Sequence, residues 1–300
     1  MKNLSLLTAL ALVLCGSMWA QEAPQEPVQP TTLYSFQDVQ YPGDTFTQLL
    51  GISNGNQIAG YHNFNTNSGF TLALPKSFTT ENYPGSAMTQ VIGINNNSKT
   101  SGFYVDQKGI THGFTHQGTV YTTVDYPGTK FNQLLSQNDN RQAAGYYSMS
   151  VNNTTPDTPY IFDENGGVFE VLTIPGAVGG AQATGINNSQ QICGFYIDSK
   201  NVNHGFYISQ GNFMRLDAPN STFTQALGLN NVNEVVGDFV DKGGATHGFV
   251  YNVTTNTWQQ VDDPAGFGTT VVNGTNDKHQ LVGFWGSNPN NTGFVATLEP

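Results

Sequence analysis

The chain has 300 residues, of which only 10% are charged, and its formal net charge at pH 7 is −11. A chain this acidic lacks the basic surface that binds a phosphate backbone, so nucleic acid is excluded from its expected partners. Of its two cysteines, Cys15 lies in an N-terminal segment that we expect to be removed, which leaves Cys193 alone and excludes an internal disulfide framework.

The first twenty residues predict a secretory signal. They begin with Lys2, continue as an apolar run too short for a membrane span, and favour cleavage after Ala20. Cys15 would permit a lipid anchor, but Leu14 stands where lipid-anchored precursors carry a small residue. Residues 21–32 are rich in Pro and Gln and predict an extended spacer. No later stretch approaches the roughly 18 apolar residues of a membrane span, so we expect a soluble secreted or periplasmic protein.

Residues 33–300 contain six copies of one unit, and we expect them to form one domain. In each copy a second glycine follows nine residues after a first glycine, which copy three replaces by Ser136. The first positions are Gly51, Gly93, Ser136, Gly185, Gly228 and Gly274, and the second are Gly60, Gly102, Gly145, Gly194, Gly237 and Gly283. A proline precedes each first position by nine or ten residues. The second glycine indicates a place where a neighbouring backbone or aromatic ring leaves no room for a Cβ.

Each copy predicts four short antiparallel strands, which in copy two cover 89–94, 100–106, 112–116 and 121–127. The Asn-rich turn after the first strand is expected to need residues that tolerate a left-handed backbone. Four strands in each of six copies predict an all-β fold, a six-bladed β-propeller. Two β-trefoils of three copies each are the alternative, but they would need a linker between copies three and four, where strand-like sequence continues.

The repeat region begins and ends at different points within the four-strand unit. The chain enters it through a lone outer-type strand over 33–42 and leaves it after a third-strand segment over 292–298. The last blade is therefore one strand short. We expect the N-terminal strand to pair beside the C-terminal segment, which would close the ring and remove two exposed sheet edges.

The repeat resembles the extracellular HAF repeat family of secreted bacterial proteins, named for a His-Ala-Phe motif. The run "TTVDYPG", the Asn-rich first turn and a His-Gly-Phe triplet carry the likeness, which covers nearly all of 33–298. It is strongest in copies two, four and five, with the triplet at 112–114, 204–206 and 247–249, where glycine replaces the family's alanine. The resemblance implies a bacterial exported protein and implies no reaction.

The same three copies place an aspartate six residues before a histidine. The pairs are Asp106 with His112, Asp198 with His204, and Asp241 with His247. Such a pair can be a general base or two ligands of a metal ion, but each copy offers only two residues, and different blades cannot pool theirs. We favour a structural brace, in which carboxylate and imidazole are hydrogen-bonded across the turn between the second and third strands. No catalytic residue, metal site or cofactor is therefore predicted.

Three tyrosines, Tyr41, Tyr83 and Tyr126, each precede the proline of an inter-blade connection in successive blades. Rings placed along one face beside amide and hydroxyl groups suit sugar or peptide binding. The alternative is that each ring packs beneath its own loop. Insertions at 148–159 in copy three and 285–291 in copy six also break the symmetry, and such departures are where partners tend to be recognised.

Two functions remain open from the sequence. The inner strands, such as "TQLLG" and "TQVIG", bring no carboxylate or histidine to the axis. This favours a non-enzymatic binding or scaffolding module for a polymer such as a glycan, or for a protein partner, and we expect a monomer. The alternative is a hydrolase or lyase with its site at the channel mouth. Carboxylates at Asp139, Asp262, Asp263 and Asp277 are candidates, but sequence cannot set their separations.

Overall fold

The computed structural model describes residues 21–22, 34–75, 77–151 and 156–299. The expected signal over 1–20, with Cys15, and Leu33 lie outside the described residues. Of the expected spacer only Gln21–Glu22 is described, and it forms β1, which pairs in parallel with β18 at Met214 and Arg215.

The described part of the chain is built from strands and turns and contains no helix, as the alternating apolar and polar residues of short strands predict. The remaining strands are β2 (Tyr34–Val39), β3 (Thr47–Ile52), β4 (Gln57–His62), β5 (Ser68–Ala73), β6 (Ser77–Thr80), β7 (Met88–Ile94), β8 (Thr100–Val105), β9 (Thr111–Gln117), β10 (Val120–Val124), β11 (Phe131–Gln137), β12 (Gln142–Ser148), β13 (Thr158–Asp163), β14 (Val168–Val171), β15 (Ala181–Ile186), β16 (Ile192–Ile197), β17 (Asn203–Ser209), β18 (Asn212–Leu216), β19 (Ser221–Leu229), β20 (Glu234–Asp241), β21 (Thr246–Asn252), β22 (Thr257–Val261), β23 (Val271–Thr275), β24 (Leu281–Ser287) and β25 (Asn290–Leu298).

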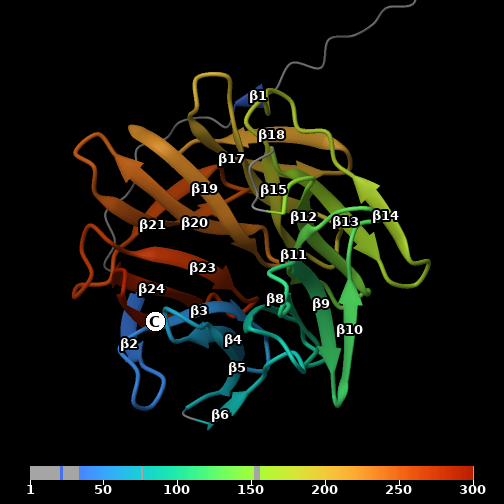
Figure 1. The fold of residues 1–300 in the computed structure, drawn as a ribbon. Coiled ribbons are helices and arrows are strands. Elements are labelled where there is room, and N and C mark those ends of the chain that lie inside the picture. The colour runs from blue at the N-terminus through green and yellow to red at the C-terminus, as the bar shows by residue number, and fades with distance from the viewer. Residues whose placement is uncertain (1–20, 23–33, 76, 152–155, 300) are drawn as a thin grey trace, which may run out of the picture.

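The strands are arranged as a β-propeller, with sheets radiating around a central axis (Figure 1). Strands β3–β6, β15–β18 and β19–β22 each form an antiparallel group of four. Strands β7–β10 and β11–β14 form two more groups, joined into one sheet by a single parallel pair between Thr111 and Phe131. The last sheet has the order β2-β25-β24-β23. This arrangement is that of a propeller and not of two β-trefoils.

The two ends of the repeat region pair as the phase mismatch predicts. Strand β2 runs antiparallel to β25, with Tyr34 opposite Leu298 and Val39 opposite Gly293. The N-terminal strand therefore becomes the outer strand of the sheet that the C-terminal segment forms, and it covers an edge that would otherwise expose unpaired backbone groups.

The close approach predicted at the second glycine is confirmed. A Cβ on Gly237 would lie 1.8 Å from the Gln225 carbonyl oxygen and 2.9 Å from the Phe249 ring. The first glycine has a separate reason: a Cβ on Gly51 would lie 2.6 Å from the Ile92 carbonyl oxygen of the neighbouring inner strand. The inner strands therefore approach one another closely at this position, where copy three alone carries a side chain, the small Ser136.

The core of each four-stranded group is filled by the aromatic residue of the third strand. These residues are Phe70, Phe114, Tyr160, Phe206, Phe249 and Phe294, all fully buried. Burying one such ring stabilises the fold by about 1.5–3 kcal/mol, so the Phe of the His-Gly-Phe triplet is a packing residue.

Removing residues 21–42 tests the closure of the ring. The deletion takes away β2 and exposes the edge of β25, so we expect aggregation or a large fall in melting temperature. Removing only residues 21–32 leaves β2 in place and is the control. A 21–42 deletion protein that melts with the full chain in a thermal scan would show that β2 does not close the sheet.

Candidate functional site

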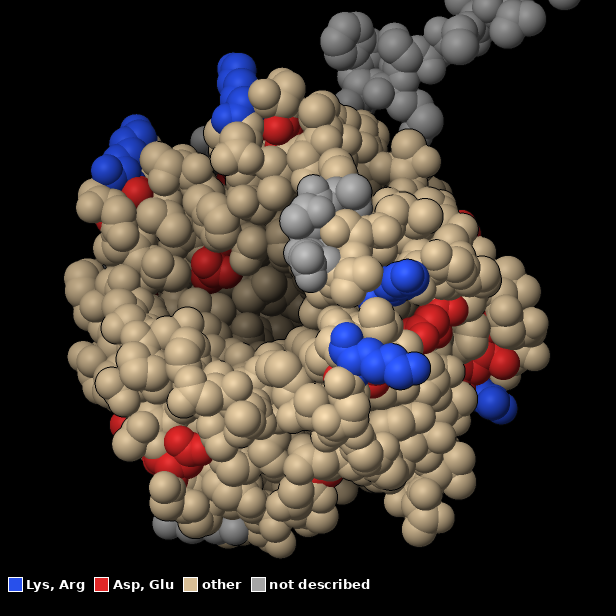
Figure 2. Space-filling view, viewed as in Figure 1, with Lys and Arg blue, Asp and Glu red and all other residues tan. Residues whose placement is uncertain are grey.

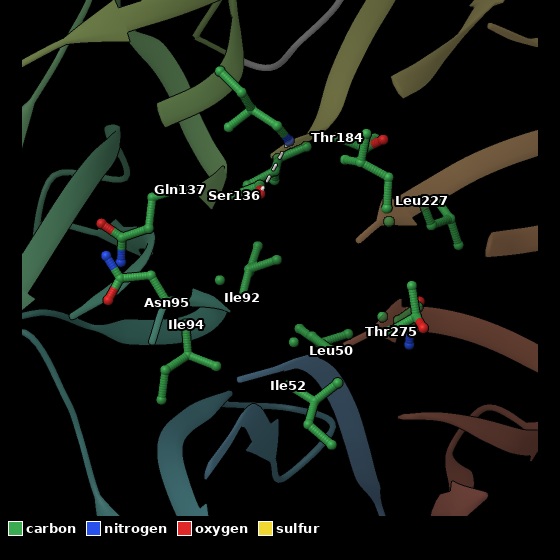
Figure 3. A pocket seen from close by; sticks show the side chains of 18 of the residues that line it. Leu50, Ile52, Ile92, Ile94, Asn95, Ser136, Gln137, Thr184, Leu227 and Thr275 are labelled. Carbon is green, nitrogen blue, oxygen red and sulfur yellow. Dashed lines mark hydrogen bonds between the residues drawn. The ribbon is translucent and has the colours of Figure 1, made fainter. Parts of the chain in front are cut away.

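A channel of about 500 Å³ runs along the propeller axis. Its wall comes from the inner strands β3, β7, β11, β15, β19 and β23. Figure 2 shows the hollow at the centre of one face, bordered mainly by uncharged residues. Figure 3 shows aliphatic side chains of this wall, among them Leu50, Ile92 and Leu227. The middle of the channel is therefore apolar.

One end of the channel carries a continuous hydrogen-bonded ring, which we call the mouth ring. Its members are Asn54, Asn96, Asp139, Asn188, Asn231 and Asp277. The backbone N–H of each member donates to the side-chain oxygen of the member in the next copy, at 2.8 or 2.9 Å throughout. The last of these bonds, from Asp277 N to Asn54 Oδ1, joins copy six to copy one.

A second layer of contacts supports the mouth ring from the preceding residue. Asn187 is typical: its Nδ2 donates to the Asn230 carbonyl of the next copy at 2.9 Å. Its Oδ1 accepts from Ser189 N and Gln191 N of its own turn, both at 3.0 Å. Asn95, Asn138, Asn230 and Asn276 repeat the pattern, and Ser53 lacks the amide. Each Asn therefore holds its own turn and the next one.

From the sequence alone these asparagines are expected to act only within their own turn. The left-handed backbone falls instead two residues after each mouth-ring member, as at Ser98 with φ 57° and Gln190 with φ 60°. The signal for the ring was two consecutive Asn-type residues at the same place in nearly every copy. Their link to the neighbouring copy could not be seen without the spatial arrangement.

Two carboxylates, Asp139 and Asp277, sit in the mouth ring three copies apart. Asp139 accepts one backbone N–H from Asn96 and the side-chain amides of Asn96 and Asn188. Asp277 likewise accepts from Asn231 and from the Asn54 amide, at 2.7 Å. Burial works to raise the pKa of Asp277, but these hydrogen bonds outweigh it and hold the pKa below its usual value. Both carboxylates are therefore built-in acceptors.

The other end of the channel lies on the face that carries the connecting prolines, which we call the proline face. Its prolines are Pro42, Pro84, Pro127, Pro175, Pro219 and Pro264. Each inner strand starts at this face, and its first residues bring a glutamine to the channel in five copies, Gln48, Gln90, Gln133, Gln182 and Gln225, all half-buried. Tyr61, Phe103 and Phe195 line the same cavity. This end therefore combines amides with aromatic rings.

Within each of the three pairs the aspartate and the histidine lie close together. However, the predicted hydrogen bond between them is not the shortest contact that the histidine makes. His112 Nε2 lies 3.7 Å from Asp106 Oδ2, beyond hydrogen-bond reach. The corresponding separations are 3.4 Å for His204 and Asp198, and 3.5 Å for His247 and Asp241.

The shorter contact of each histidine goes to a second aspartate, which the sequence analysis missed as a partner. His112 Nδ1 lies 2.6 Å from Asp125 Oδ2, at the end of the fourth strand. His204 pairs with Asp217 at 2.8 Å and His247 with Asp262 at 2.9 Å. Each imidazole is thus held between two carboxylates. The available signal was the aspartate two residues before the connecting proline, in "VDYP", "LDAP" and "VDDP".

The first aspartate of each pair mainly closes its own turn. Asp106 Oδ1 accepts Lys108 N at 2.7 Å and Ile110 N at 2.9 Å. The bond from Ile110 is the main reason that the pKa of Asp106 lies below its usual value. Asp198 and Asp241 are held in the same way. These contacts are internal to the turns, and the bond from each aspartate to its histidine, which defined the predicted brace, is not among them.

The three tyrosines pack inside their own copies. Tyr83 stacks on Tyr104 with ring centroids 3.7 Å apart, and Tyr41 stacks on His62 at 3.5 Å. Tyr126 stacks in the same way on Tyr147. All three rings are half-buried, which matches the packing alternative. A direct contact with a ligand stays a prediction for these residues.

One buried carboxylate, Asp238, was not singled out from the sequence. It stands directly after the second glycine of copy five, where the other copies carry an aromatic residue such as Tyr61 or Phe103. Its side chain is buried in β20, and burial raises its pKa to about 7.

Cys193 is also buried, and burial raises the pKa of its thiol to about 12, so this thiol is not a nucleophile at neutral pH.

Among the described residues, no group of three or more His, Cys, Asp or Glu side chains is arranged to hold a metal ion. Within the same ranges, no helix has the length and apolar character of a membrane span.

No family model matches the chain, and no curated protein matches it. Solved structures are similar in fold. AofleA from Arthrobotrys oligospora is 12% identical, with a TM-score of 0.54 over 91% of this chain and 89% of that chain. A lectin from Aleuria aurantia, described as a six-bladed β-propeller with a novel fucose recognition mode, is 10% identical, with a TM-score of 0.51 over 86% and 97%. Virginiamycin B lyase from Staphylococcus aureus is 9% identical, with a TM-score of 0.50 over 88% and 99%. At these identities the likeness establishes the β-propeller fold alone.

The second layer beneath the mouth ring can be tested at Asn187. Replacing Asn187 by Ala removes two acceptor bonds in its own turn and the donor bond to copy five, and should lower the free energy of unfolding by about 1–3 kcal/mol. Chemical denaturation measures the change. Asn212→Ala, at an exposed start of β18, is the matched control. Equal stability of the two variants would contradict a supporting role for Asn187.

Asp238 predicts a pH-dependent change in stability. Its pKa is raised from 3.8 to about 7 in the folded protein, so ionisation of the buried carboxyl destabilises the fold increasingly between these pH values. Asn at this position stays neutral. The melting temperature of Asp238→Asn relative to the parent should therefore rise from pH 4 to pH 7 and then level off. A difference that does not change with pH would show that Asp238 is not buried as a carboxyl.

Proposed function

We propose that the chain is an exported, non-enzymatic binding or scaffolding module, built as a closed six-bladed β-propeller. Its ligand is a polymer such as a glycan, or a protein partner, which meets the proline face at the glutamine end of the channel. The observation that carries this proposal is the lining of that end by five half-buried glutamines beside Tyr61, Phe103 and Phe195.

The chemistry of this end suits an uncharged ligand. A glutamine amide both donates and accepts hydrogen bonds, as hydroxyl groups of sugars and peptide groups of proteins require. Aromatic rings add apolar surface with a defined orientation. Exposed rings on turns of the same face extend this surface, since Phe64 is 43% exposed and Phe267 is 72% exposed. Because few charges take part, binding should change little with salt.

The similar folds support a binding role without specifying it. The Aleuria aurantia protein is a lectin described with a fucose recognition mode, so a propeller of this size and general shape can recognise sugar. That description concerns the lectin itself. For the present chain it makes a glycan the first ligand class to test.

A hydrolase or lyase is the second candidate, because virginiamycin B lyase shares the fold and two carboxylates lie at the opposite mouth. Asp139 and Asp277 are poorly suited to acid–base chemistry, however. Each already accepts hydrogen bonds from both neighbouring copies, and the pKa of Asp277 is held below its usual value by such bonds. The mouth ring is therefore better explained as a structural closure.

A secreted or periplasmic location and membership of the extracellular HAF repeat family are parts of the same proposal. The signal-like residues 1–20 support export. The His-Gly-Phe triplets and Asn-rich turns of copies two, four and five support the family assignment. The location would be tested by finding the protein in a given fraction of fractionated cells of its source, and the family assignment rests on the repeat residues alone.

The binding proposal is tested by screening residues 21–300 against glycan and peptide arrays, and repeating the screen with Gln90→Ala combined with Gln225→Ala. Loss of two amides should weaken binding of any hit by about tenfold or more, while the melting temperature should fall only by as much as the loss of the Gln90 bond to Asn67 Oδ1 explains. Gln117→Ala, at an exposed position of β9, is the control. Unchanged binding by the double variant would place the site elsewhere, and turnover of a glycan or peptide that survives stringent purification would contradict a non-enzymatic role.

A further inference from the structure

The residue before the connecting proline differs in kind in copy six. The six residues at this position are Tyr41, Tyr83, Tyr126, Ile174, Ala218 and Asp263. Five of them are apolar or aromatic and pack in the core of their copy. A carboxylate occupies the position only in copy six, which places a charge where the repeat otherwise buries an apolar group.

The residue that faces this position has changed as well. The Tyr41 hydroxyl lies 3.3 Å from Thr80 Oγ1, and the Tyr83 hydroxyl lies 2.8 Å from Thr123 Oγ1. Each threonine stands four residues before the next connecting proline, on the outer strand of its sheet. The outer strand of the last sheet is β2, and its residue at this place is Asp38. A hydrogen-bonded Tyr–Thr pair has thus become two carboxylates.

Asp263 lacks a complete set of partners. Its side chain is only 2% exposed. Oδ1 accepts Ala265 N at 2.8 Å, whereas Oδ2 is buried and has no hydrogen-bond partner within the described ranges. A buried acceptor without a donor is costly. Burial, together with the nearby negative charge of Asp38, raises the pKa of Asp263. The site therefore lacks a donor, and a positively charged one would fit it best.

No cation of the described chain supplies that donor. The ion pairs that its Lys and Arg side chains make involve Glu164 and Asp217 and neither of these two carboxylates. Asp38 lies at the surface, and its Oδ1 accepts Trp285 Nε1–H at 3.0 Å. Two neighbouring carboxylates thus face the same space, and no Lys or Arg ion pair of the described residues neutralises their charge.

That space is a shallow pocket with apolar walls. Asp38 and Asp263 line it together with Tyr34, Phe36 and Pro264. Phe36 is fixed by an edge-on contact with Phe294, with ring centroids 5.3 Å apart. An apolar wall beside an acidic floor suits a ligand with a hydrocarbon stem and a charged head.

We propose that this pocket binds an organic cation with an apolar stem, specifically a guanidinium group that donates N–H to Asp263 Oδ2 and to Asp38. A guanidinium is planar, presents several donors in a fixed fork and packs against aromatic faces, which matches two carboxylates beside Phe36 and Tyr34. The site uses neither the channel nor its glutamines, so it goes beyond the proposed glycan or protein binding.

The test is calorimetric titration of residues 21–300 with butylguanidinium at low salt, which we expect to give saturable binding. Asp263→Asn keeps the shape and removes the charge, and should weaken binding by about tenfold or more. Asp263→Tyr restores the ring of copies one to three, so it should fill the pocket and abolish binding without lowering the melting temperature. Glu170→Gln makes the same change of charge at an exposed position of β14 and should bind as the parent does.

Two peptides show whether the guanidinium group belongs to a protein partner or to a small free cation. A blocked arginine tripeptide that binds more tightly than butylguanidinium supports a protein partner, and equal affinity supports a small free cation. The matched citrulline tripeptide, which lacks the charge, should not bind. The proposal is overturned if the parent does not bind butylguanidinium, or if Asp38→Asn and Asp263→Asn both bind it like the parent. If glycan or peptide hits from the arrays still bind Asp263→Asn, the proposed binding function stands whatever happens to guanidinium binding. Failure of one proposal can therefore be told from failure of the other.

Discussion

The propeller depends on the hydrogen bonds that pass from the inner turn of each copy to the next. Because each backbone N–H of the mouth ring donates to the following side chain, the six inner strands are held at one distance from the axis. Strands held this close leave little room for a Cβ at the first position, as the 2.6 Å approach at Gly51 illustrates, and copy three alone places a small side chain there, Ser136. The repeated Asn-type residues and the repeated glycine are therefore two consequences of one constraint.

The ring also restricts where charge can lie. An aspartate accepts but does not donate, so a carboxylate in the ring needs amide donors on both sides. Asp139 has Asn96 and Asn188 as neighbours, and Asp277 has Asn231 and Asn54. If two neighbouring members of the ring were both aspartates, no side-chain amide would lie between their carboxylates to donate a hydrogen bond to either. The three-copy separation of the two charges satisfies this rule and also keeps the charges apart.

The sequence predicted the parts of the fold that follow from spacing. Strand order, the close approach at Gly237 and the pairing of β2 with β25 could all be inferred from the period and phase of the repeat. Contacts between distant positions could not. Asp125 binds His112 across 13 residues because β10 pairs with β9, whereas the nearer Asp106 was the obvious partner in the sequence. Asp238 and Asp263 were visible as departures from the repeat, but their burial depends on packing that the sequence does not state.

Asp38 and Asp263 depart from the repeat where the two ends of the chain meet, and this has a physical reason. No hairpin sets the register of β2 against β25, so side-chain contacts must do so. Trp285 donates to Asp38, Asn273 donates to the Leu49 carbonyl, and Asp277 bonds Asn54, all between residues more than 220 positions apart. A ligand held by both Asp38 and Asp263 would join the same two ends. Since such a ligand binds only the closed arrangement, its binding free energy would add to the stability of the ring. Occupancy of this pocket and closure of the propeller would then be coupled.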